Sequence, residues 1–207
     1  MFKDRQDAGQ KLGKALEKYK DKDVLVLAIP KGGVEIGHEV AQYLNAEFSI
    51  LIARKLPFPF NPEAGFGAIA EDGTYYVMDR LKSSLSEEDI ARIVDQQKDE
   101  IKRRIEVLRK SEPLPELKDK TVILTDDGIA TGSTMTVSVK LCKKQGADKI
   151  VVATPVAGQR TIKKFQKMVD EVEVLESPAN FRAVAQVYEN WYDVSDEEVL
   201  EIIYGDR

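Results

Sequence analysis

The chain has 207 residues, with 31 basic and 36 acidic side chains and a formal net charge of −5. Hydrophobic residues make up 43% and charged residues 32% of it, which excludes a disordered, collagen-like or disulfide-bonded scaffold. A net acidic chain argues against broad nucleic-acid binding, and no apolar run approaches the roughly 20 residues that span a bilayer. With one cysteine, Cys142, and a charged N-terminus, the sequence predicts a soluble cytoplasmic protein that binds neither nucleic acid nor membrane.

The first part of the chain alternates between helical and strand patterns. Apolar residues at three- and four-residue spacing predict a helix over residues 4–20. The short aliphatic run 23–30 predicts a strand that is buried on both faces. A helical pattern over 31–46 and an apolar run over 48–54 follow, so these segments predict a βαβ unit.

The middle of the chain interrupts this alternation. Three prolines and two glycines within residues 56–67 predict a mobile loop. An Asp-Gly turn between two β-prone runs predicts a hairpin over 68–79. A long amphipathic helix is predicted over 86–110, and we expect its basic stretch 102–110 to form a solvated face.

The second half returns to strands and helices in turn, over residues 121–125, 131–145, 149–155, 160–168 and 172–176. This order predicts an α/β fold of three layers, α/β/α, with a mostly parallel twisted sheet. We expect one domain over 1–207, with a core of about 21–176. The remainder, about 177–207, is expected to form a small C-terminal hood that ends in a capped helix and packs against the helix 4–20.

The most informative stretch is VILTDDGIATGST, residues 122–134. It passes from a buried strand through two carboxylates into a loop of small and hydroxylated residues, and then into a helix. A helix N-terminus offers unpaired N–H groups and a partial positive charge, so such a loop can wrap a phosphate closely. Ionised carboxylates only accept hydrogen bonds, so Asp126 and Asp127 suit the hydroxyls of a sugar. Together these features predict a site for a ribose 5-phosphate.

An ordinary strand-to-helix turn, in which Asp127 begins a bend and one hydroxyl caps the helix, is the simpler interpretation of this stretch. A cap needs only one such residue, whereas the stretch contains two acids and a run of glycines and hydroxyls. It is not a Walker A loop, because no lysine follows Gly132, and its glycines do not have the Rossmann spacing.

The stretch VILTDDGIATGST resembles the phosphoribosyl-pyrophosphate binding motif of the type I phosphoribosyltransferases. The resemblance extends to IPKGG at residues 29–33, which is similar to the pyrophosphate loop of the family, and to the strand order across 23–176. The whole chain is similar to an uncharacterised microbial branch of that family. The resemblance implies an enzyme that transfers ribose 5-phosphate from phosphoribosyl pyrophosphate to a nitrogenous base and releases pyrophosphate, with Mg²⁺ as cofactor.

The resemblance also implies roles for individual residues. Asp126 and Asp127 would be the catalytic acids, which hold the ribose hydroxyls and lie nearest the metal. The 5-phosphate would be bound by the seven residues that follow them, Gly128, Ile129, Ala130, Thr131, Gly132, Ser133 and Thr134. Pyrophosphate would be bound by Lys31, Gly32, Gly33, Arg54 and Lys55.

The two proposed loops are expected to face one crevice. Ligands of open α/β sheets bind beyond the carboxyl ends of the strands, where the winding direction reverses. The strand order of the family places strands 23–29 and 121–125 side by side at that point.

The acceptor base stays open. Phe181 in the hood is the candidate to stack on the base, and Trp191 and Tyr192 offer further aromatic surfaces. The 6-oxopurine enzymes of the family carry an acid at the position held here by Ala130, so this chain departs from them.

Further expectations concern how the site works. The loop 56–67 would close over it to exclude water, and Glu63 or Glu71 would transfer a proton. We also expect a homo-oligomer, a dimer. The alternative hypothesis is a regulatory protein that senses phosphoribosyl pyrophosphate or a nucleotide with the same pocket and has no catalytic activity. A phosphatase-like or kinase-like enzyme is disfavoured, because the chain lacks the nucleophile or the P-loop lysine that it would need.

Overall fold

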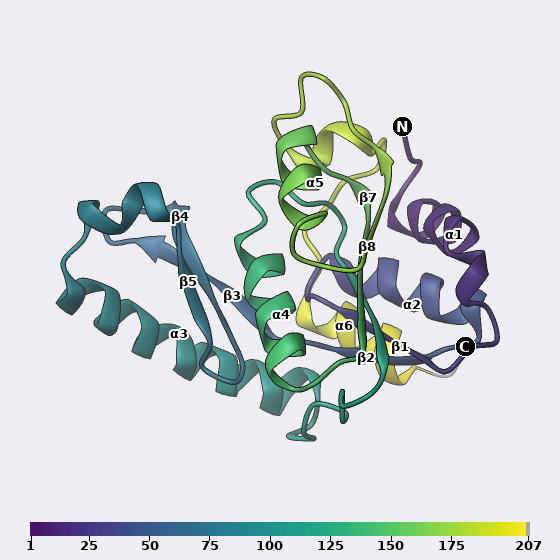
Figure 1. Ribbon diagram of the computed structural model, residues 1–207, viewed down its shortest axis with the longest axis horizontal. Helices are drawn as coiled ribbons and strands as arrows, with labels where there is room; N and C mark the ends of the chain where they lie inside the picture. Colours follow the sequence, from purple (N-terminus) through teal and green to yellow (C-terminus); the bar gives the residue numbers. More distant parts are fainter. Residues whose placement is uncertain (206–207) are drawn as a thin grey trace.

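The computed structural model describes residues 1–205, without the side chains of Glu63, Lys82 and Ser83. Its centre is a sheet of parallel strands (Figure 1). The sheet has five strands, in the order β2-β1-β6-β7-β8. The strands are β1 (Val24–Ala28), β2 (Glu47–Ile50), β6 (Thr121–Thr125), β7 (Lys149–Val156) and β8 (Glu171–Glu176). Every residue of β1 is buried, which confirms that the aliphatic run is a strand covered on both faces.

Helices cover both faces of this sheet. They are α1 (Arg5–Ala15), followed by the 3-10 helix η1 (Glu17–Tyr19), α2 (Gly33–Leu44), α4 (Ser133–Lys144) and α5 (Gln159–Phe165). Val24 and Val26 of β1 pack with residues of α1 and α2, whereas Leu25 and Leu27 pack with residues of α4 and α5. Alternate side chains of one strand thus serve two cores, and the predicted three-layer α/β/α fold is confirmed.

A second, antiparallel sheet lies between α4 and the long helix α3 (Glu87–Leu108), which follows the 3-10 helix η2 (Asp79–Ser84) (Figure 1). Its strands are β3 (Ala53–Phe58), β4 (Asn61–Ala70) and β5 (Tyr75–Val77). The turn at Gly73, with φ of 81°, confirms the predicted hairpin. The predicted mobile loop over 56–67 is wrong, because most of these residues belong to β3 and β4. Pro57 is tolerated because β3 is an edge strand and its pairing register shifts there, and Pro62 lies in β4 between the paired positions Asn61 and Gly65.

The predicted strand over 48–54 is two strands in different sheets. β2 ends at Ile50, and β3 begins at Ala53 in the antiparallel sheet. Arg54 and Lys55 therefore lie at the start of β3, and not beyond the end of a parallel strand. The run from Ile50 to Ala53 is buried throughout, so its hydrophobicity gives no sign of the change of sheet.

The helix α3 begins as predicted, with the Ser86 hydroxyl accepting a hydrogen bond from the Asp89 N–H at 3.1 Å. The basic stretch 102–110 is not a uniformly solvated face, because Arg104 and Arg109 are buried. Arg109 donates to the Glu71 carboxylate at 2.8 Å, so its charge is paired inside the protein.

After β8 the chain forms two segments that pack against different parts of the molecule. The segment with the 3-10 helix η3 (Val184–Val187) runs beside the N-terminus, where the Phe2 N–H donates to the Val187 carbonyl at 2.7 Å. The last helix, α6 (Asp196–Tyr204), has the predicted capping box at Ser195 and packs against α2 and α3. None of the helices within residues 1–205 has the length and hydropathy that a bilayer crossing requires.

Candidate active site

Two loops meet at the carboxyl edge of the five-stranded sheet. β1 and β6 pair in parallel from Val24 opposite Thr121 to Ala28 opposite Thr125. The loops that leave them touch, since a Cβ on Gly33 would lie 2.9 Å from the Asp126 Cα. The two segments are therefore in contact, although only the segment after β6 lines the cavity described next, so the expectation that both face one crevice stays a prediction.

A cavity of about 520 Å³ lies between the β6–α4 loop and the antiparallel sheet. Asp126 and all seven residues from Gly128 to Thr134 line its first wall. Lys55 and Arg80 bring two cations to the opposite wall, beside apolar residues of β3 and β4. Arg80 did not figure among the residues selected from the sequence, because it follows a hairpin whose position over the loop no local pattern reveals.

The start of α4 carries a hydroxyl that has no partner. The Ser133 Oγ atom is buried and makes no hydrogen bond to any described residue. A buried hydroxyl without a partner costs about 1–3 kcal/mol, which an oxygen of a bound anion would recover. Gly132 precedes it with φ of 73°, and a Cβ there would lie 2.9 Å from the Phe165 ring. Only glycine fits this turn, and it leaves the helix N-terminus open to the cavity.

The two adjacent acids interact with each other and differ in their other contacts. Asp126 lines the cavity, whereas the Asp127 carboxylate accepts a hydrogen bond from the Arg5 Nε atom at 3.0 Å. The Asp127 carbonyl accepts a second hydrogen bond from the Tyr188 hydroxyl at 2.7 Å. Burial and the neighbouring Asp127 carboxylate raise the pKa of Asp126 well above its usual range. Burial also raises the pKa of Asp127, and the Arg5 guanidinium opposes that shift.

The predicted pyrophosphate loop follows β1. Its peptide bond between Pro30 and Lys31 is cis. The Lys31 ammonium pairs with the Asp196 carboxylate at 3.1 Å, at the start of α6. Gly32 lies so close to Asp127 that a Cβ would be 1.9 Å from the Asp127 Oδ2 atom. The loop is thus packed directly on the second acid of the pair.

Of the cationic pair at the start of β3, the structure brings only one residue to the cavity. Lys55 lines it. Arg54 points to the other side of the sheet, where its Nε atom donates to the Gln97 side chain of α3 at 3.2 Å. This opposition follows from the alternation of side chains along a strand.

The aromatic candidates lie outside this cavity. Phe181 packs beside Gly158, where a Cβ would be 3.5 Å from its ring. Trp191 and Tyr192 instead surround the Arg5 guanidinium, with ring centroids at 4.1 and 5.3 Å. Arg5 was missed in the sequence, although it lies on the apolar face of its helix, at three- and four-residue spacing with Ala8 and Leu12.

Glu63 and Glu71 were the two acids expected to transfer a proton, and the structure locates the side chain of only one of them. Glu71 is buried against Arg109 and accepts a hydrogen bond from the Ile52 N–H at 3.3 Å. These contacts hold its carboxylate outside the cavity. The side chain of Glu63 lies outside the described part of the chain.

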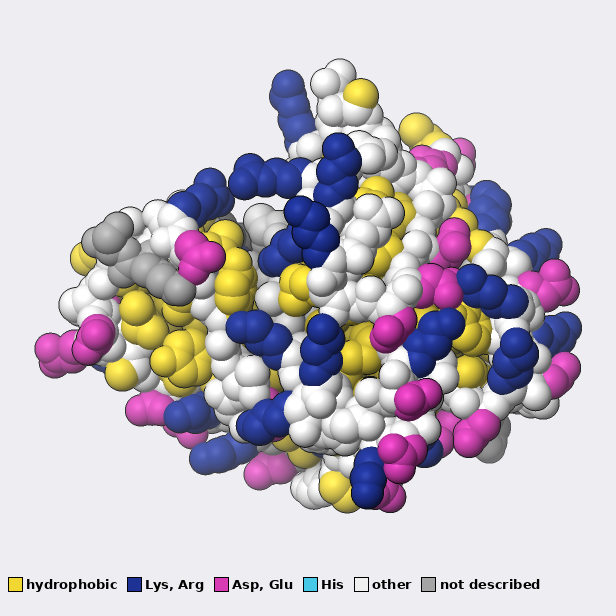
Figure 2. Space-filling model, viewed as in Figure 1, with side chains coloured by type: hydrophobic (Ala, Val, Ile, Leu, Met, Phe, Trp, Pro, Cys, Tyr) yellow, Lys and Arg dark blue, Asp and Glu magenta, His cyan; other side chains and the backbone are white. Residues whose placement is uncertain are grey.

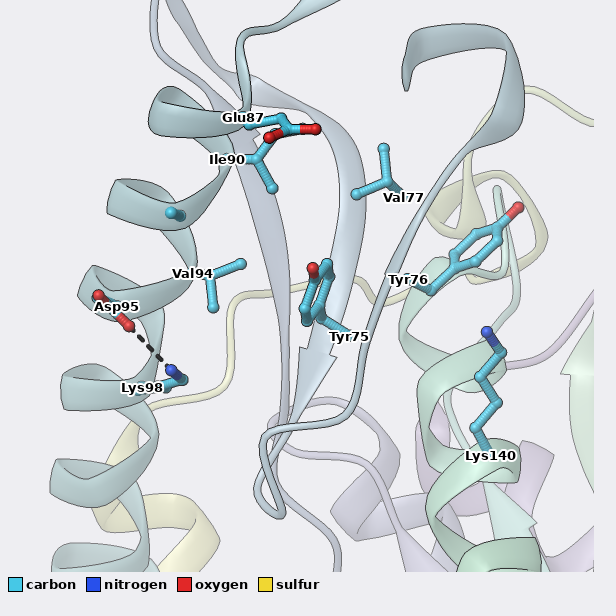
Figure 3. Close-up of a pocket in the computed structure, with 10 residues that line it drawn as sticks. Tyr75, Tyr76, Val77, Glu87, Ile90, Val94, Asp95, Lys98 and Lys140 are labelled. Carbon is cyan, nitrogen blue, oxygen red and sulfur yellow. Dashed lines mark hydrogen bonds and ion pairs between the residues drawn. The ribbon is translucent and has the colours of Figure 1, made fainter.

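A larger groove of about 830 Å³ lies between α3 and β5 (Figure 3). It is lined by Tyr75, Val77, Ile90 and Val94, and Figure 2 shows hydrophobic side chains gathered over this part of the surface. None of the residues selected from the sequence lines it. Size alone therefore does not identify the site, and the acid, the unpaired hydroxyl and the helix N-terminus identify the smaller cavity.

The described residues contain no cluster of three or more His, Cys, Asp or Glu side chains that could hold a metal ion. A Mg²⁺ ion needs no such cage, since it keeps several waters and takes one or two carboxylates together with substrate oxygens. Asp126, which lines the cavity, fits that role.

The family profile for the phosphoribosyl transferase domain matches residues 3–190. The "Putative phosphoribosyl transferase Rv0571c" of Mycobacterium tuberculosis is 38% identical over 205 residues, which are 98% of this chain and 46% of that protein. The chain thus spans about half the length of the curated relatives it matches. A shorter similarity, 47% over 36 residues, links 17% of the chain to 18% of "Transcriptional regulator GfcR" of Methanosphaera stadtmanae.

Among solved structures, the protein TT1426 from Thermus thermophilus superposes with a TM-score of 0.82 at 33% identity, covering 98% of this chain and 97% of that one. The similarity thus includes both sheets. With the family profile matching nearly the whole chain, these comparisons show that the chain belongs to the phosphoribosyl transferase domain family.

Proposed function

We propose that the protein is a phosphoribosyltransferase, which transfers ribose 5-phosphate from phosphoribosyl pyrophosphate to a nitrogenous base and releases pyrophosphate. The observation that carries the proposal is the buried, unpaired Ser133 hydroxyl at the start of α4, in the same cavity as the Asp126 carboxylate. One group suits a phosphate and the other a sugar, as ribose 5-phosphate requires. Family membership and the names of the longer relatives support the same chemistry.

The β6–α4 loop would hold the ribose 5-phosphate. Its 5-phosphate would take the N-terminus of α4, the Ser133 hydroxyl and the backbone N–H groups from Gly128 to Thr134. Asp126 would accept hydrogen bonds from the ribose hydroxyls. Both groups stand on one rigid strand-to-helix junction, so the anomeric carbon would be held in a fixed place.

The leaving pyrophosphate would be stabilised from two sides. The backbone of the loop from Lys31 to Gly33 would donate to it, and Lys55 and Arg80 would face it from the opposite wall. The Lys31 ammonium would exchange Asp196 for pyrophosphate oxygens. The geometry does not support Arg54 in this role, because it is bonded to Gln97.

Mg²⁺ would lie beside Asp126 and supply positive charge to the pyrophosphate as it departs. The covering wall of β3 and β4 would exclude water, in place of the mobile loop expected from the prolines. Phe181 stays a prediction for the base, because it lies outside the cavity that holds the sugar.

The similarity to a protein named as a transcriptional regulator favours one other candidate, a sensor that binds phosphoribosyl pyrophosphate without turnover. The sensor and the enzyme would share the sugar and phosphate contacts, so binding alone does not separate them.

The test is pyrophosphate release from phosphoribosyl pyrophosphate with Mg²⁺, across a panel of purine and pyrimidine bases. We expect turnover with at least one base, and a loss of about 100-fold or more in Asp126→Asn, because a developing charge loses its partner. Asp148→Asn, at an exposed position immediately before β7, is the matched control and should leave the rate unchanged. Tight binding of phosphoribosyl pyrophosphate with no turnover on any base would favour the sensor. No binding of it would contradict both hypotheses.

A further inference from the structure

One face of α5 packs against the loop between β6 and α4. Thr161, Lys164 and Phe165 lie at three- and four-residue spacing, which puts them on one side of the helix. The Thr161 hydroxyl donates to the Ala130 carbonyl at 3.0 Å. The Phe165 ring lies 2.9 Å from the position that a Cβ on Gly132 would take. This face of α5 therefore supports the loop at two places.

The third residue of this face is a lysine that bonds to a hydroxyl of α4. The Lys164 Nζ atom donates to the Thr136 Oγ1 atom at 2.7 Å. An ammonium only donates, so the hydroxyl accepts from it and directs its own proton elsewhere. That proton goes to the Gly132 carbonyl, which lies 2.6 Å from the Thr136 Oγ1 atom. Two hydrogen bonds in series, the Lys164–Thr136 relay, thus join the ammonium to the peptide between Gly132 and Ser133.

The N–H end of this peptide lies at the proposed phosphate site. It belongs to Ser133, the first residue of α4, where helix N–H groups have no partner within the helix. Ser133 also lines the cavity. A hydrogen bond to the carbonyl end of a peptide polarises it and strengthens its N–H end as a donor. The charge of Lys164 would therefore act on a bound phosphate through Thr136 and this one peptide.

We propose that Lys164 is a positioning residue for the 5-phosphate: through the Thr136 hydroxyl it orients and polarises the Gly132–Ser133 peptide, whose N–H group donates to a phosphate oxygen. This inference rests on the proposed function, and it deepens it by adding a cation that acts on the phosphate without touching it.

The surroundings of Lys164 favour a nearby anion. Its side chain is half-buried, and it has no carboxylate partner among the described residues. Burial and the Lys140 ammonium lower the pKa of Lys164. The Lys164 and Lys140 ammonium groups lie 4.9 and 5.2 Å from the centroid of the Tyr76 ring, and Figure 3 shows Lys140 pointing toward Tyr76. A phosphate at the start of α4 would supply the negative charge that these two cations lack.

A simpler interpretation is that Thr136 makes the bond that threonines in helices commonly make to the carbonyl four residues earlier. The same helix offers a comparison, because the Ser138 hydroxyl donates to the Thr134 carbonyl at 3.0 Å and no ammonium of the described residues bonds to it. The bond from Thr136 is shorter, at 2.6 Å. Hydrogen bonds that a charge assists are shorter than neutral ones, so the difference agrees with polarisation by Lys164.

The first experiment measures the affinities for ribose 5-phosphate and for pyrophosphate with Mg²⁺ separately, by titration calorimetry, in Lys164→Met, Thr136→Val and the double variant. We expect each single variant to bind ribose 5-phosphate about 10-fold more weakly and pyrophosphate as the wild type does, because only the phosphate site loses the relay. The double variant should lose little more than either single variant, since the two residues act in series. Multiplied losses, or equal losses for the two ligands, would overturn the inference.

Conservative variants separate the relay from a general loss of packing or charge. Lys164→Arg and Thr136→Ser keep the cation and the hydroxyl, so both should bind ribose 5-phosphate nearly as the wild type does. Lys163→Met, at an exposed position of the same helix, is the matched control and should equal the wild type. A loss in any of these three as large as that in Lys164→Met would overturn the inference. Urea unfolding reports whether the variants fold, and Lys164→Met, at a half-buried position, decides the question if Thr136→Val does not.

The second experiment uses turnover. The 5-phosphate takes no part in the bond that breaks, so Lys164→Met should raise the KM for phosphoribosyl pyrophosphate about 10-fold and leave kcat nearly unchanged. A lower kcat with an unchanged KM would contradict the inference.

The outcomes separate this inference from the proposed function. If the wild type turns over and Lys164→Met has the same KM and affinity, only the inference fails. If the wild type binds phosphoribosyl pyrophosphate without turnover, the enzyme hypothesis fails, and the affinities for ribose 5-phosphate decide the inference. If the wild type does not bind ribose 5-phosphate, both are wrong.

Discussion

The strands that lead into the two walls of the cavity differ in burial. In β6 only the first residue is not buried, whereas in β3, which carries Lys55, only Ala53 and Leu56 are buried. Every residue of β1 is buried, and in β7 only the first residue is not. In β5 only Val77 is buried, and Tyr75 is 51% exposed. Since resistance to local opening follows burial, the wall that carries Asp126 and the phosphate loop is the more stable one. In the proposed reaction, the groups that would be aligned first thus stand on the more stable wall, and the cations that would face the leaving pyrophosphate stand on the other.

The largest expected effect tests this difference directly. Leu25→Ala removes a side chain that is 0% exposed in β1, and we expect it to lower the free energy of unfolding by about 2–5 kcal/mol through a cavity between two layers. Tyr75→Ala, in β5, should cost less than about 1 kcal/mol. Urea denaturation followed by circular dichroism measures both. Equal losses of unfolding free energy in the two variants would contradict the difference in stability between the two walls.

The next effect compares two glycines at the same edge of the stable sheet. In Gly32→Ala the added Cβ would meet the Asp127 Oδ2 atom at 1.9 Å, and Arg5 prevents that carboxylate from moving aside. We expect a loss of about 100-fold in pyrophosphate release, because the loop must shift. In Gly158→Ala, after β7, the Cβ would meet only the Phe181 ring at 3.5 Å, an ordinary contact. If Gly158→Ala releases pyrophosphate at nearly the wild-type rate and Gly32→Ala is slow, the steric restriction lies in the segment between β1 and α2.

The central strands were predictable, because aliphatic runs such as 23–30 and 121–125 are dense enough to require burial on both faces. Their neighbouring positions in the sheet were implied by the resemblance to the family, and not by these runs. The change of sheet between Ile50 and Ala53 was not predictable, because hydrophobicity indicates that a segment is buried but does not identify the strand with which it pairs. The predicted loop over 56–67 failed for a related reason. Proline removes a backbone donor, and an edge strand does not need that donor.

The position of the two acids directly after β6 was predictable, whereas the partner of each side chain was not. Asp126 and Asp127 are identical in sequence terms, and both were expected to hold the sugar. The structure has one acid in the cavity and the other on Arg5. Only the fold brings that arginine, 122 positions away, to the loop.

The smallest expected effect concerns α3, the helix that packs against the antiparallel sheet. Glu100 in α3 accepts hydrogen bonds from Arg103 at 2.9 Å and from Arg104 at 3.0 Å, which lower its pKa from 4.5 to about 2. A carboxylate with a lowered pKa in the folded state adds stability above its unfolded pKa and loses it as the pH falls through the folded value. We therefore expect Glu100→Gln to cost about 1 kcal/mol or less at neutral pH, because the group is partly solvated.

This difference between wild type and Glu100→Gln should shrink below pH 4.5 and vanish near pH 2, as measured by urea unfolding at a series of pH values. Asp99→Asn is the matched control, because Asp99 is 81% exposed and its contact with Lys102 is 3.6 Å long. Arg103 also reaches Asp196 of α6, the partner of Lys31, at 3.4 Å. If the Glu100→Gln cost persisted unchanged at pH 2, the helix would owe its stability to packing alone, and the contrast between the two walls would not depend on these charges.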